Sequence, residues 1–194
     1  MSTLLPATPP GQTVGPFFGY ALPFDRCNEL VPPGSPNAVQ LHGVVADADG
    51  RGLPDALLEI WQADADGSIP NASGSLHRDG WTFTGWGGRA TTDEAGGRYT
   101  FTTVIPGVSE PVAAPFISIT VFARGGLLNR LFTRAYIPGK QLENDSLLNT
   151  LTPERRDTLI ATRDRTGLRF DIQLQGTPPD KPETVFLRYP GHQR

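Results

Sequence analysis

The stretch Phe116-Ile117-Ser118-Ile119-Thr120-Val121-Phe122-Ala123-Arg124 decides the fold. Its isoleucines and its valine stand two residues apart, with serine and threonine between them, and this alternation is typical of a half-buried β-strand. Six further segments alternate in a similar way, so we predict strands at residues 38–46, 56–63, 97–105, 116–124, 132–137, 168–175 and 183–189. Strands of this number and length predict an all-β protein, a two-layer antiparallel β-sandwich.

Turn and cap residues divide these strands. The segment 47–50 contains Asp and Gly and the segment 94–97 contains two Gly, residues that tolerate positive φ, so we predict tight connections between antiparallel strands at both. Thr152 before Pro153 is typical of a helix start, and a turn at 146–148 would make one or two short helices in all. Residues 68–88 predict a long irregular loop.

The composition excludes several classes of protein. With 22 Gly and 19 Pro among 194 residues, a helical bundle is excluded, while 38% hydrophobic residues suffice for the core of one domain. The net charge of −3 argues against nucleic acid and anionic membranes as partners. A single cysteine, Cys27, rules out an internal disulfide and fits a reducing compartment. We see no signal peptide or membrane span and expect a soluble, cytoplasmic protein.

The first 36 residues differ from the rest of the chain. Residues 1–36 are dense in Pro and Gly, which predicts an extended N-terminal arm ahead of a β-sandwich domain at 37–194. The arm carries Phe17, Phe18 and Tyr20, whose rings are unfavourable in water. The arm therefore either folds back onto its own domain or reaches a partner chain, and the residues alone leave both open.

A search for catalytic chemistry finds little. The three histidines, His42, His77 and His192, are not spaced to share a metal ion, and no nucleophile motif is present. Arg124 follows the most apolar strand and precedes two glycines, so its guanidinium could hold a carboxylate through two parallel hydrogen bonds, with an ordinary surface salt bridge as the alternative. Taken alone, the residues indicate a sandwich without a catalytic centre of its own.

Several motifs nevertheless resemble one family. These are GQTVGP at 11–16, LEIWQADADG at 58–67, GRATTD at 88–93, FARG at 122–125, FDIQLQG at 170–176 and ETVFL at 183–187. Over nearly its whole length the chain resembles the intradiol ring-cleaving dioxygenases, and in particular the iron-free chain of members built from two homologous chains. The resemblance implies a β-sandwich paired with an iron-binding beta chain, in a higher oligomer of alpha-beta pairs. Such a complex would open the ring of 3,4-dihydroxybenzoate with O2, giving 3-carboxymuconate in aromatic catabolism by the β-ketoadipate pathway.

The resemblance also assigns positions. Iron-bearing chains of the family hold Fe(III) with two tyrosines and two histidines, and these positions, in that order, are Ile69, Val108, Phe116 and Ser118 here. A nearby arginine position is Ala113. The resemblance therefore implies no metal and no catalytic residue in this chain: Fe(III) belongs to the beta chain, and the isolated chain is inactive. We expect side chains to fill the vestigial pocket around the four replaced positions.

The arm and one arginine receive a role from the same resemblance. It implies that the alpha chain completes the partner's substrate pocket through Thr13, Gly15, Pro16 and Arg124. Thr13 would supply a hydrogen bond and Gly15 a close backbone approach. Whether Arg124 touches the substrate directly or acts through its field stays open.

Two other functions remain as alternatives. The first is a stand-alone β-sandwich binding module that recognises a ligand with Trp81 and Trp86 in the long loop. The second is a metal hydrolase that uses His42 or His77 with nearby carboxylates. A stable monomer with a dispensable arm would favour the first, and metal in the isolated chain would favour the second.

Overall fold

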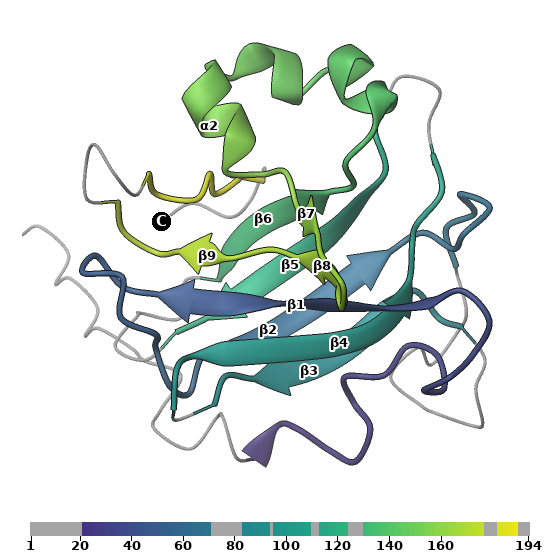
Figure 1. Cartoon of the computed structure of the whole chain (residues 1–194), viewed down its shortest axis with the longest axis vertical. Coiled ribbons are helices and arrows are strands. Elements are labelled where there is room, and N and C mark those ends of the chain that lie inside the picture. Colours follow the sequence, from purple (N-terminus) through teal and green to yellow (C-terminus); the bar gives the residue numbers. More distant parts are fainter. Residues whose placement is uncertain are drawn as a thin grey trace, which may run out of the picture.

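Two packed β-sheets form the body of the protein (Figure 1). The computed structural model describes residues 21–70, 83–93, 95–109, 113–123, 130–176 and 182–189. The first sheet has the order β4-β1-β8-β7, with β9 paired to the far end of β1. Its strands are β1 (Ala38–Ala46), β4 (Arg98–Val104), β7 (Thr162–Arg163), β8 (Gly167–Arg169) and β9 (Ile172–Gln173).

The second sheet has four strands in the order β3-β2-β5-β6, and every neighbouring pair is antiparallel. Its strands are β2 (Leu57–Gln62), β3 (Trp86–Thr91), β5 (Phe116–Phe122) and β6 (Leu131–Tyr136). The expected all-β, two-layer sandwich is confirmed. The first sheet is mixed rather than antiparallel, because β8 and β9 both run parallel to β1.

The core lies between the two sheets and follows the period-two pattern. On β5, Ile117, Ile119 and Val121 are buried, whereas the residues between them face outward and are partly exposed. Leu41 and Phe101 meet them from the first sheet, and both are fully buried. Alternation in the sequence thus settles which face of each strand packs inward.

The predicted strands agree closely with β1, β2, β4, β5 and β6 and differ from the structure elsewhere, and β7 was not predicted. The predicted strand 168–175 is broken into β8 and β9, since the carboxylate of Asp171 takes the hydrogen bond of the Val44 amide at 3.0 Å. The prediction of a strand at 183–189 is wrong: Leu187 makes an isolated bridge to Phe132. The predicted loop 68–88 extends too far, because β3 begins at Trp86.

The two glycine-rich turns form as predicted. Gly50 donates to Asp47 at 2.9 Å, and Gly97 donates to Asp93 at 3.1 Å, with positive φ at both glycines. Each segment leads from one sheet to the other, from β1 to β2 and from β3 to β4. After the turn at 47–50, Gly52 forms an antiparallel bridge with Ala46, so the expected tight antiparallel connection is present there. The named strands that each turn joins nevertheless belong to different sheets. The same turn residues here lead the chain from one sheet of the sandwich to the other.

A helical segment covers one end of the sandwich (Figure 1). It consists of η1 (Lys140–Asn144), η2 (Leu148–Thr150) and α2 (Pro153–Asp157), and α2 begins at the predicted proline. A second apolar cluster fixes this segment to the end of β6 and contains Ala114, Tyr136, Leu142, Leu148, Leu159 and Val185. Within the part of the chain that the structure describes, no helix is long and apolar enough to cross a membrane.

The end of the N-terminal segment belongs to the domain itself. Leu30 donates to Thr102 at 2.7 Å, and Thr102 donates to Asn28 at 2.9 Å, so residues 28–30 run beside β4. Cys27 and Leu30 are buried. The chain is therefore anchored to its own first sheet at residues 28–30.

Candidate functional site

The outer face of the second sheet carries two of the replaced ligand positions. Phe116 and Ser118 lie on β5 at the positions that point away from the core. Across the strand pair, Phe116 is opposite Tyr136 and Ser118 is opposite Arg134. Trp61 on β2 is opposite Ser118 from the other side and is 39% exposed. Residues 61, 118 and 134 therefore form one row across three strands.

Two loops bring the other two positions to the surface. The loop after β2 holds Ile69 and the loop after β4 holds Val108, and the Gly107 amide donates to the Asp64 carbonyl at 2.8 Å to join them. Gly67 takes φ +87° and lies against the backbone of Val108, where a β-carbon would not fit. Ile69 and Val108 are 62% and 41% exposed. Two apolar side chains thus stand in solvent at two of the positions that the resemblance assigns.

A cavity of about 620 Å³ opens beside these positions. It is lined by Ile69, Ala113 and Phe116, three of the five positions assigned by resemblance, together with Arg134 and Tyr189. The expectation that side chains fill the vestigial pocket is not met beside Ile69 and Phe116, where this cavity is open. Ala113 is small, and the Phe116 ring packs against Tyr136 with centroids 5.5 Å apart, so these replacements leave space open. Ser118 and Val108 do not line this cavity.

Three polar side chains form a hydrogen-bonded chain at the cavity, and two of them, Arg134 and Asp145, line it. Arg134 Nη1 donates to the Tyr136 hydroxyl at 3.2 Å, and that hydroxyl donates to Asp145 Oδ1 at 3.2 Å. Asp145 is buried and also accepts from the amides of Leu148 and Ala114, each at 3.0 Å. The carboxylate therefore ties the helical segment to the end of the second sheet.

The charge states of this chain follow from burial. Burial raises the pKa of Tyr136 to about 12, with Arg134 opposing the rise and Asp145 adding to it. Burial acts to lower the pKa of Arg134, but its hydrogen bond to Tyr136 and the influence of Tyr136 and Tyr189 raise it overall. At neutral pH Tyr136 is a neutral phenol and Arg134 is a cation.

The residues of this site do not fit a ferric ion. Fe(III) favours anionic oxygen and imidazole ligands, whereas Ile69, Val108 and Phe116 carry no donor atom and Ser118 offers a neutral hydroxyl. Tyr136 is one nearby phenol, and its raised pKa and two existing hydrogen bonds disfavour the phenolate. Among the described residues, no three His, Cys, Asp or Glu side chains gather where they could hold a metal.

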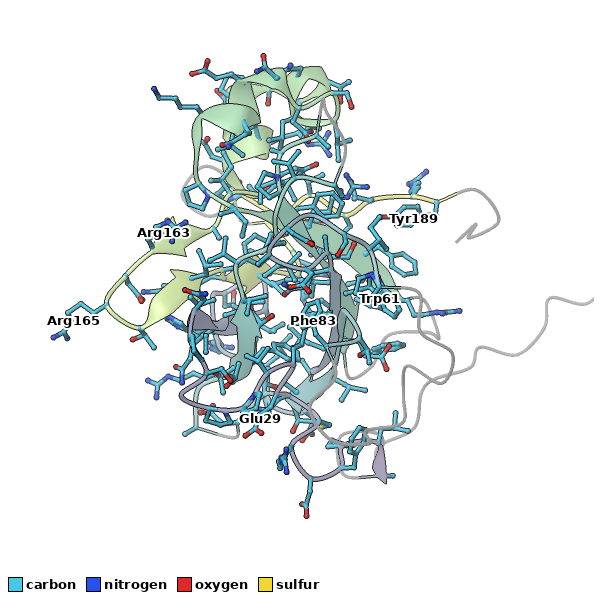
Figure 2. The ribbon with its side chains drawn as sticks, turned by 90° about the vertical axis from the view of Figure 1, so that its right-hand side faces the viewer. Glu29, Trp61, Phe83, Arg163, Arg165 and Tyr189 are labelled. Carbon is cyan, nitrogen blue, oxygen red and sulfur yellow. The ribbon has the colours of Figure 1, made fainter. Side chains whose placement is uncertain are left out.

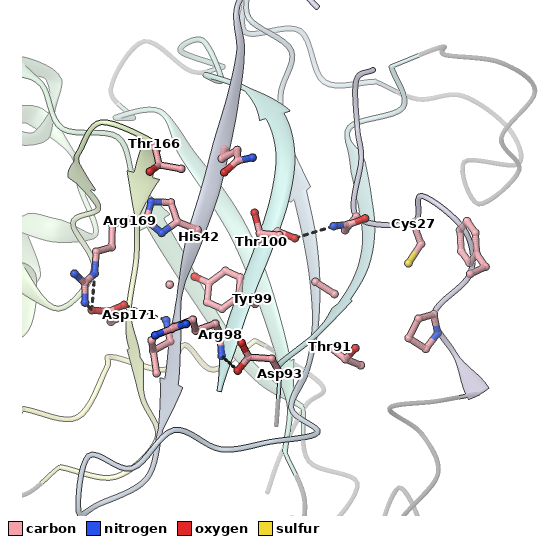
Figure 3. A pocket seen from close by; sticks show the side chains of 17 residues that line it. Cys27, His42, Thr91, Asp93, Arg98, Tyr99, Thr100, Thr166, Arg169 and Asp171 are labelled. Carbon is pink, nitrogen blue, oxygen red and sulfur yellow. Dashed lines mark hydrogen bonds and ion pairs between the residues drawn. The ribbon is translucent and has the colours of Figure 1, made fainter. Parts of the chain in front are cut away.

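A second cavity, of about 940 Å³, lies on the outer face of the first sheet (Figure 3). His42 on β1 lines it and is paired with Asp164, with 3.1 Å between Nε2 and Oδ2. Arg169 forms a pair with Asp171 at 2.8 Å on the same face. Each of these two side chains already has a carboxylate partner, so His42 has the surroundings of a surface hydrogen-bonding residue.

The remaining sequence candidates cannot be placed. Outside the described residues lie the predicted substrate-contacting residues Thr13, Gly15, Pro16 and Arg124, and also His77, Trp81 and His192. Of Trp86, the backbone is described as the first residue of β3.

Sequence reasoning missed the polar chain around Arg134. Arg134 and Tyr136 stand two residues apart within the predicted strand 132–137, which places both on one face. Pairing that strand with 116–124 would have set them opposite Ser118 and Phe116, but no signal in the sequence gives the register. Figure 2 shows Trp61 and Tyr189 on the same side of the molecule.

Comparison with known proteins gives the family. A family model described as "Dioxygenase" matches residues 14–115. The chain is 38% identical to the protocatechuate 3,4-dioxygenase alpha chain of Burkholderia cepacia, over 92% of this chain and 95% of the relative. It is 37% identical to the alpha chain of the same name from Pseudomonas putida, over 96% and 98% of the two chains.

A solved structure agrees with these sequence relatives. The dioxygenase domain of a dioxygenase carbohydrate-binding protein fusion from Streptomyces sp. SirexAA-E is 26% identical, with a TM-score of 0.57 over 87% of this chain and 98% of that one. The sandwich and these relatives lead to one conclusion: the chain belongs to the family of intradiol ring-cleaving dioxygenases.

Proposed function

We propose that this chain is the alpha subunit of a cytoplasmic protocatechuate 3,4-dioxygenase. It is the chain that binds no iron and completes the substrate pocket of a homologous beta chain, which holds Fe(III). The complex cleaves 3,4-dihydroxybenzoate with O2 to 3-carboxy-cis,cis-muconate in aromatic catabolism. The names of the two sequence relatives and the match to the dioxygenase family support this proposal.

One observation carries the division of labour between the chains. The four positions that would hold iron carry Ile69, Val108, Phe116 and Ser118. The cavity beside Ile69 and Phe116 is lined by the Arg134 cation, which is hydrogen-bonded to the neutral phenol of Tyr136. Ring opening therefore belongs to the partner's site. What this chain can contribute there is binding and orientation of the substrate.

The N-terminal arm is the proposed means of that contribution. Residues 28–30 are anchored beside β4, so the residues before them start from a fixed point on the domain surface. Thr13, Gly15 and Pro16 would line the partner's pocket, with Gly15 allowing the backbone close to the ring. Arg124 follows the end of β5 by two residues and would favour the carboxylate of the substrate.

Exposed apolar side chains support a partner on this side of the protein. Trp61, Ile69 and Val108 are among the exposed large hydrophobic residues, at 39%, 62% and 41%. Apolar side chains of this size at the surface often mark a protein interface. They lie on the outer face of the second sheet or on the two joined loops at its end.

Co-expression tests the proposal. This chain is produced alone and together with a homologous chain that carries the two tyrosines and two histidines, and iron content, colour and O2 uptake with 3,4-dihydroxybenzoate are measured. We expect the chain alone to be colourless and inactive, and the pair to be coloured and active. Stoichiometric iron and turnover in the chain alone would refute the proposal, and an unaffected monomer after deletion of residues 1–20 would favour a stand-alone binding module.

The substrate contacts need a separate variant. Arg124→Gln should lower kcat/KM for 3,4-dihydroxybenzoate by about 10- to 100-fold, the loss expected for one charge-assisted pair of about 1.5–3 kcal/mol. The control is Arg169→Gln, which removes an exposed arginine on the first sheet that is paired with Asp171. Equal kinetics for the two variants would remove Arg124 from the substrate site.

A further inference from the structure

The cavity beside the replaced ligand positions carries a surplus of positive charge. Arg134, Arg155 and Arg188 line it, and Asp145 is the one acidic side chain among its described lining residues. Asp145 does not form an ion pair with any of the three, because its oxygens accept from two backbone amides and from the Tyr136 hydroxyl. The cavity therefore attracts anions.

Arg134 is held rigidly at the wall of this cavity. Its guanidinium carbon lies 4.0 Å from the centroid of the Phe116 ring, and Nη1 donates to the Tyr136 hydroxyl. A planar guanidinium stacked on a ring and tied at one nitrogen retains little rotamer freedom. Such an arrangement prepares the group for a ligand at little cost in entropy.

One donor of Arg134 lacks a partner. The Nε atom is buried, and within the described residues no acceptor lies within hydrogen-bonding distance of it. A buried N–H without an acceptor is unfavourable, because it has lost water and gained nothing in return. A carboxylate bound in the cavity would give this guanidinium an anionic partner.

The rest of the wall suits a flat apolar body. Leu147, Leu151 and Tyr189 line the cavity together with Phe116, and the volume of about 620 Å³ lies within the range of small-molecule sites. Arg155 and Arg188 are exposed, so they would guide an anion inward without being buried by it.

We propose that this cavity is a second, non-reacting binding site for a small aromatic carboxylate, whose carboxylate group is held by Arg134 and whose ring lies against Leu151 and Tyr189. The site belongs to this chain alone and does not rest on the function proposed above. Its ligand can be the carboxylate that the partner's site consumes or an unrelated aromatic acid, since both share the recognised chemistry.

Calorimetric titration of the complete protein with benzoate tests the proposal. We expect one benzoate site on this chain, in addition to any site on an iron-binding partner. Cyclohexanecarboxylate should bind more weakly, and catechol, which has no carboxylate, should leave the site empty. A titration with 3,4-dihydroxybenzoate under anaerobic conditions then separates the two ligand sources. Absence of a benzoate site on this chain would overturn the proposal.

Variants assign the site. Arg134→Gln should weaken this benzoate site at least 10-fold, and Arg134→Lys should do so nearly as much, because an ammonium cannot form the two-pronged contact. Arg169→Gln, on the other sheet, should leave affinity unchanged. If Arg134→Gln fails to fold by circular dichroism, the exposed pair Arg155→Gln and Arg188→Gln replaces it, with an expected weakening of about 3-fold that shrinks in salt. Unchanged affinity in the folded variants would overturn the proposal.

The readout is independent of the catalytic proposal. Loss of the benzoate site in Arg134→Gln with O2 uptake unchanged is the expected result for an active complex. If the chain proves to have no iron-binding partner, the same titration should give one benzoate site per chain. The same variants then test whether Arg134 holds the benzoate.

Discussion

Gly67 and Val108 lie in backbone contact where the loop after β2 meets the loop after β4. Gly67 has φ +87°, and a β-carbon there would overlap the carbonyl oxygen of Val108. Because the atoms of Val108 that would be overlapped belong to the backbone, they cannot move aside at low energetic cost. This contact holds two of the replaced ligand positions, Ile69 and Val108, at the same end of the sandwich.

Gly67→Ala should therefore destabilise the protein and separate the two loops. We expect a loss of about 2 kcal/mol or more in the free energy of unfolding, measured with urea, from strain and overlap together. Gly34→Ala is the matched control, because Gly34 has φ +82° but nothing within 4 Å of an added β-carbon. Its loss should be about 1 kcal/mol. Equal losses in the two variants would show that the loop contact contributes nothing.

The buried pair Gln62 and Thr103 links the two sheets. The Thr103 hydroxyl donates to Gln62 Oε1 at 2.6 Å, and Gln62 Nε2 donates to the Val104 carbonyl at 2.9 Å. Gln62→Leu leaves both hydrogen-bonding partners of Gln62 unpaired in the core, so it should lower the free energy of unfolding by about 1–3 kcal/mol. Adding Thr103→Val to it removes one stranded group and should restore part of the loss. A double variant with strictly additive losses would argue against a coupled pair.

The sequence allowed prediction of the sandwich because burial on one face enforces a period of two. In β1 the predicted and observed bounds coincide, and Leu41 and Val45 are fully buried as the pattern requires. Near 170 the pattern continues but the strand does not, since Asp171 uses its side chain in place of a ladder hydrogen bond. Local alternation reports burial, and it does not report which group satisfies a backbone amide.

The site was predictable to a smaller extent. Family resemblance located Phe116 and Ser118, and the structure puts both on the outward face of one strand. Arg134 and Asp145 could not be found in this way. Their relation depends on the register between β5 and β6 and on a helical segment that folds over Tyr136, which are long-range features that no local pattern encodes.

Asp145 should be the most sensitive polar residue of the helical segment. It is 2% exposed and accepts hydrogen bonds from the Ala114 amide, the Leu148 amide and the Tyr136 hydroxyl. Asp145→Ala leaves three buried donors unmatched and should cost about 3–5 kcal/mol, measured by urea unfolding. Asp145→Asn keeps one acceptor oxygen and should cost clearly less. If both variants lost the same amount, the carboxylate would not be what holds this segment.

Stability at high pH should report on Tyr136. Its pKa is about 12 in the folded protein, mainly through burial, and returns to about 10 on unfolding. Between these values the unfolded chain releases a proton that the folded chain keeps, so the free energy of unfolding falls as pH rises from about 10 to about 12. Below pH 10 this contribution is fully present.

Tyr136→Phe isolates that contribution. The variant should be less stable than the parent protein at about pH 9, since Arg134 and Asp145 lose a shared partner. Above pH 10, however, its free energy of unfolding should fall less steeply, by up to about 1.4 kcal/mol for each pH unit. Tyr99, whose pKa burial also raises, is present in both proteins and so cancels in the comparison. Urea unfolding at several pH values gives both slopes, and parallel slopes would mean that Tyr136 titrates as an exposed phenol.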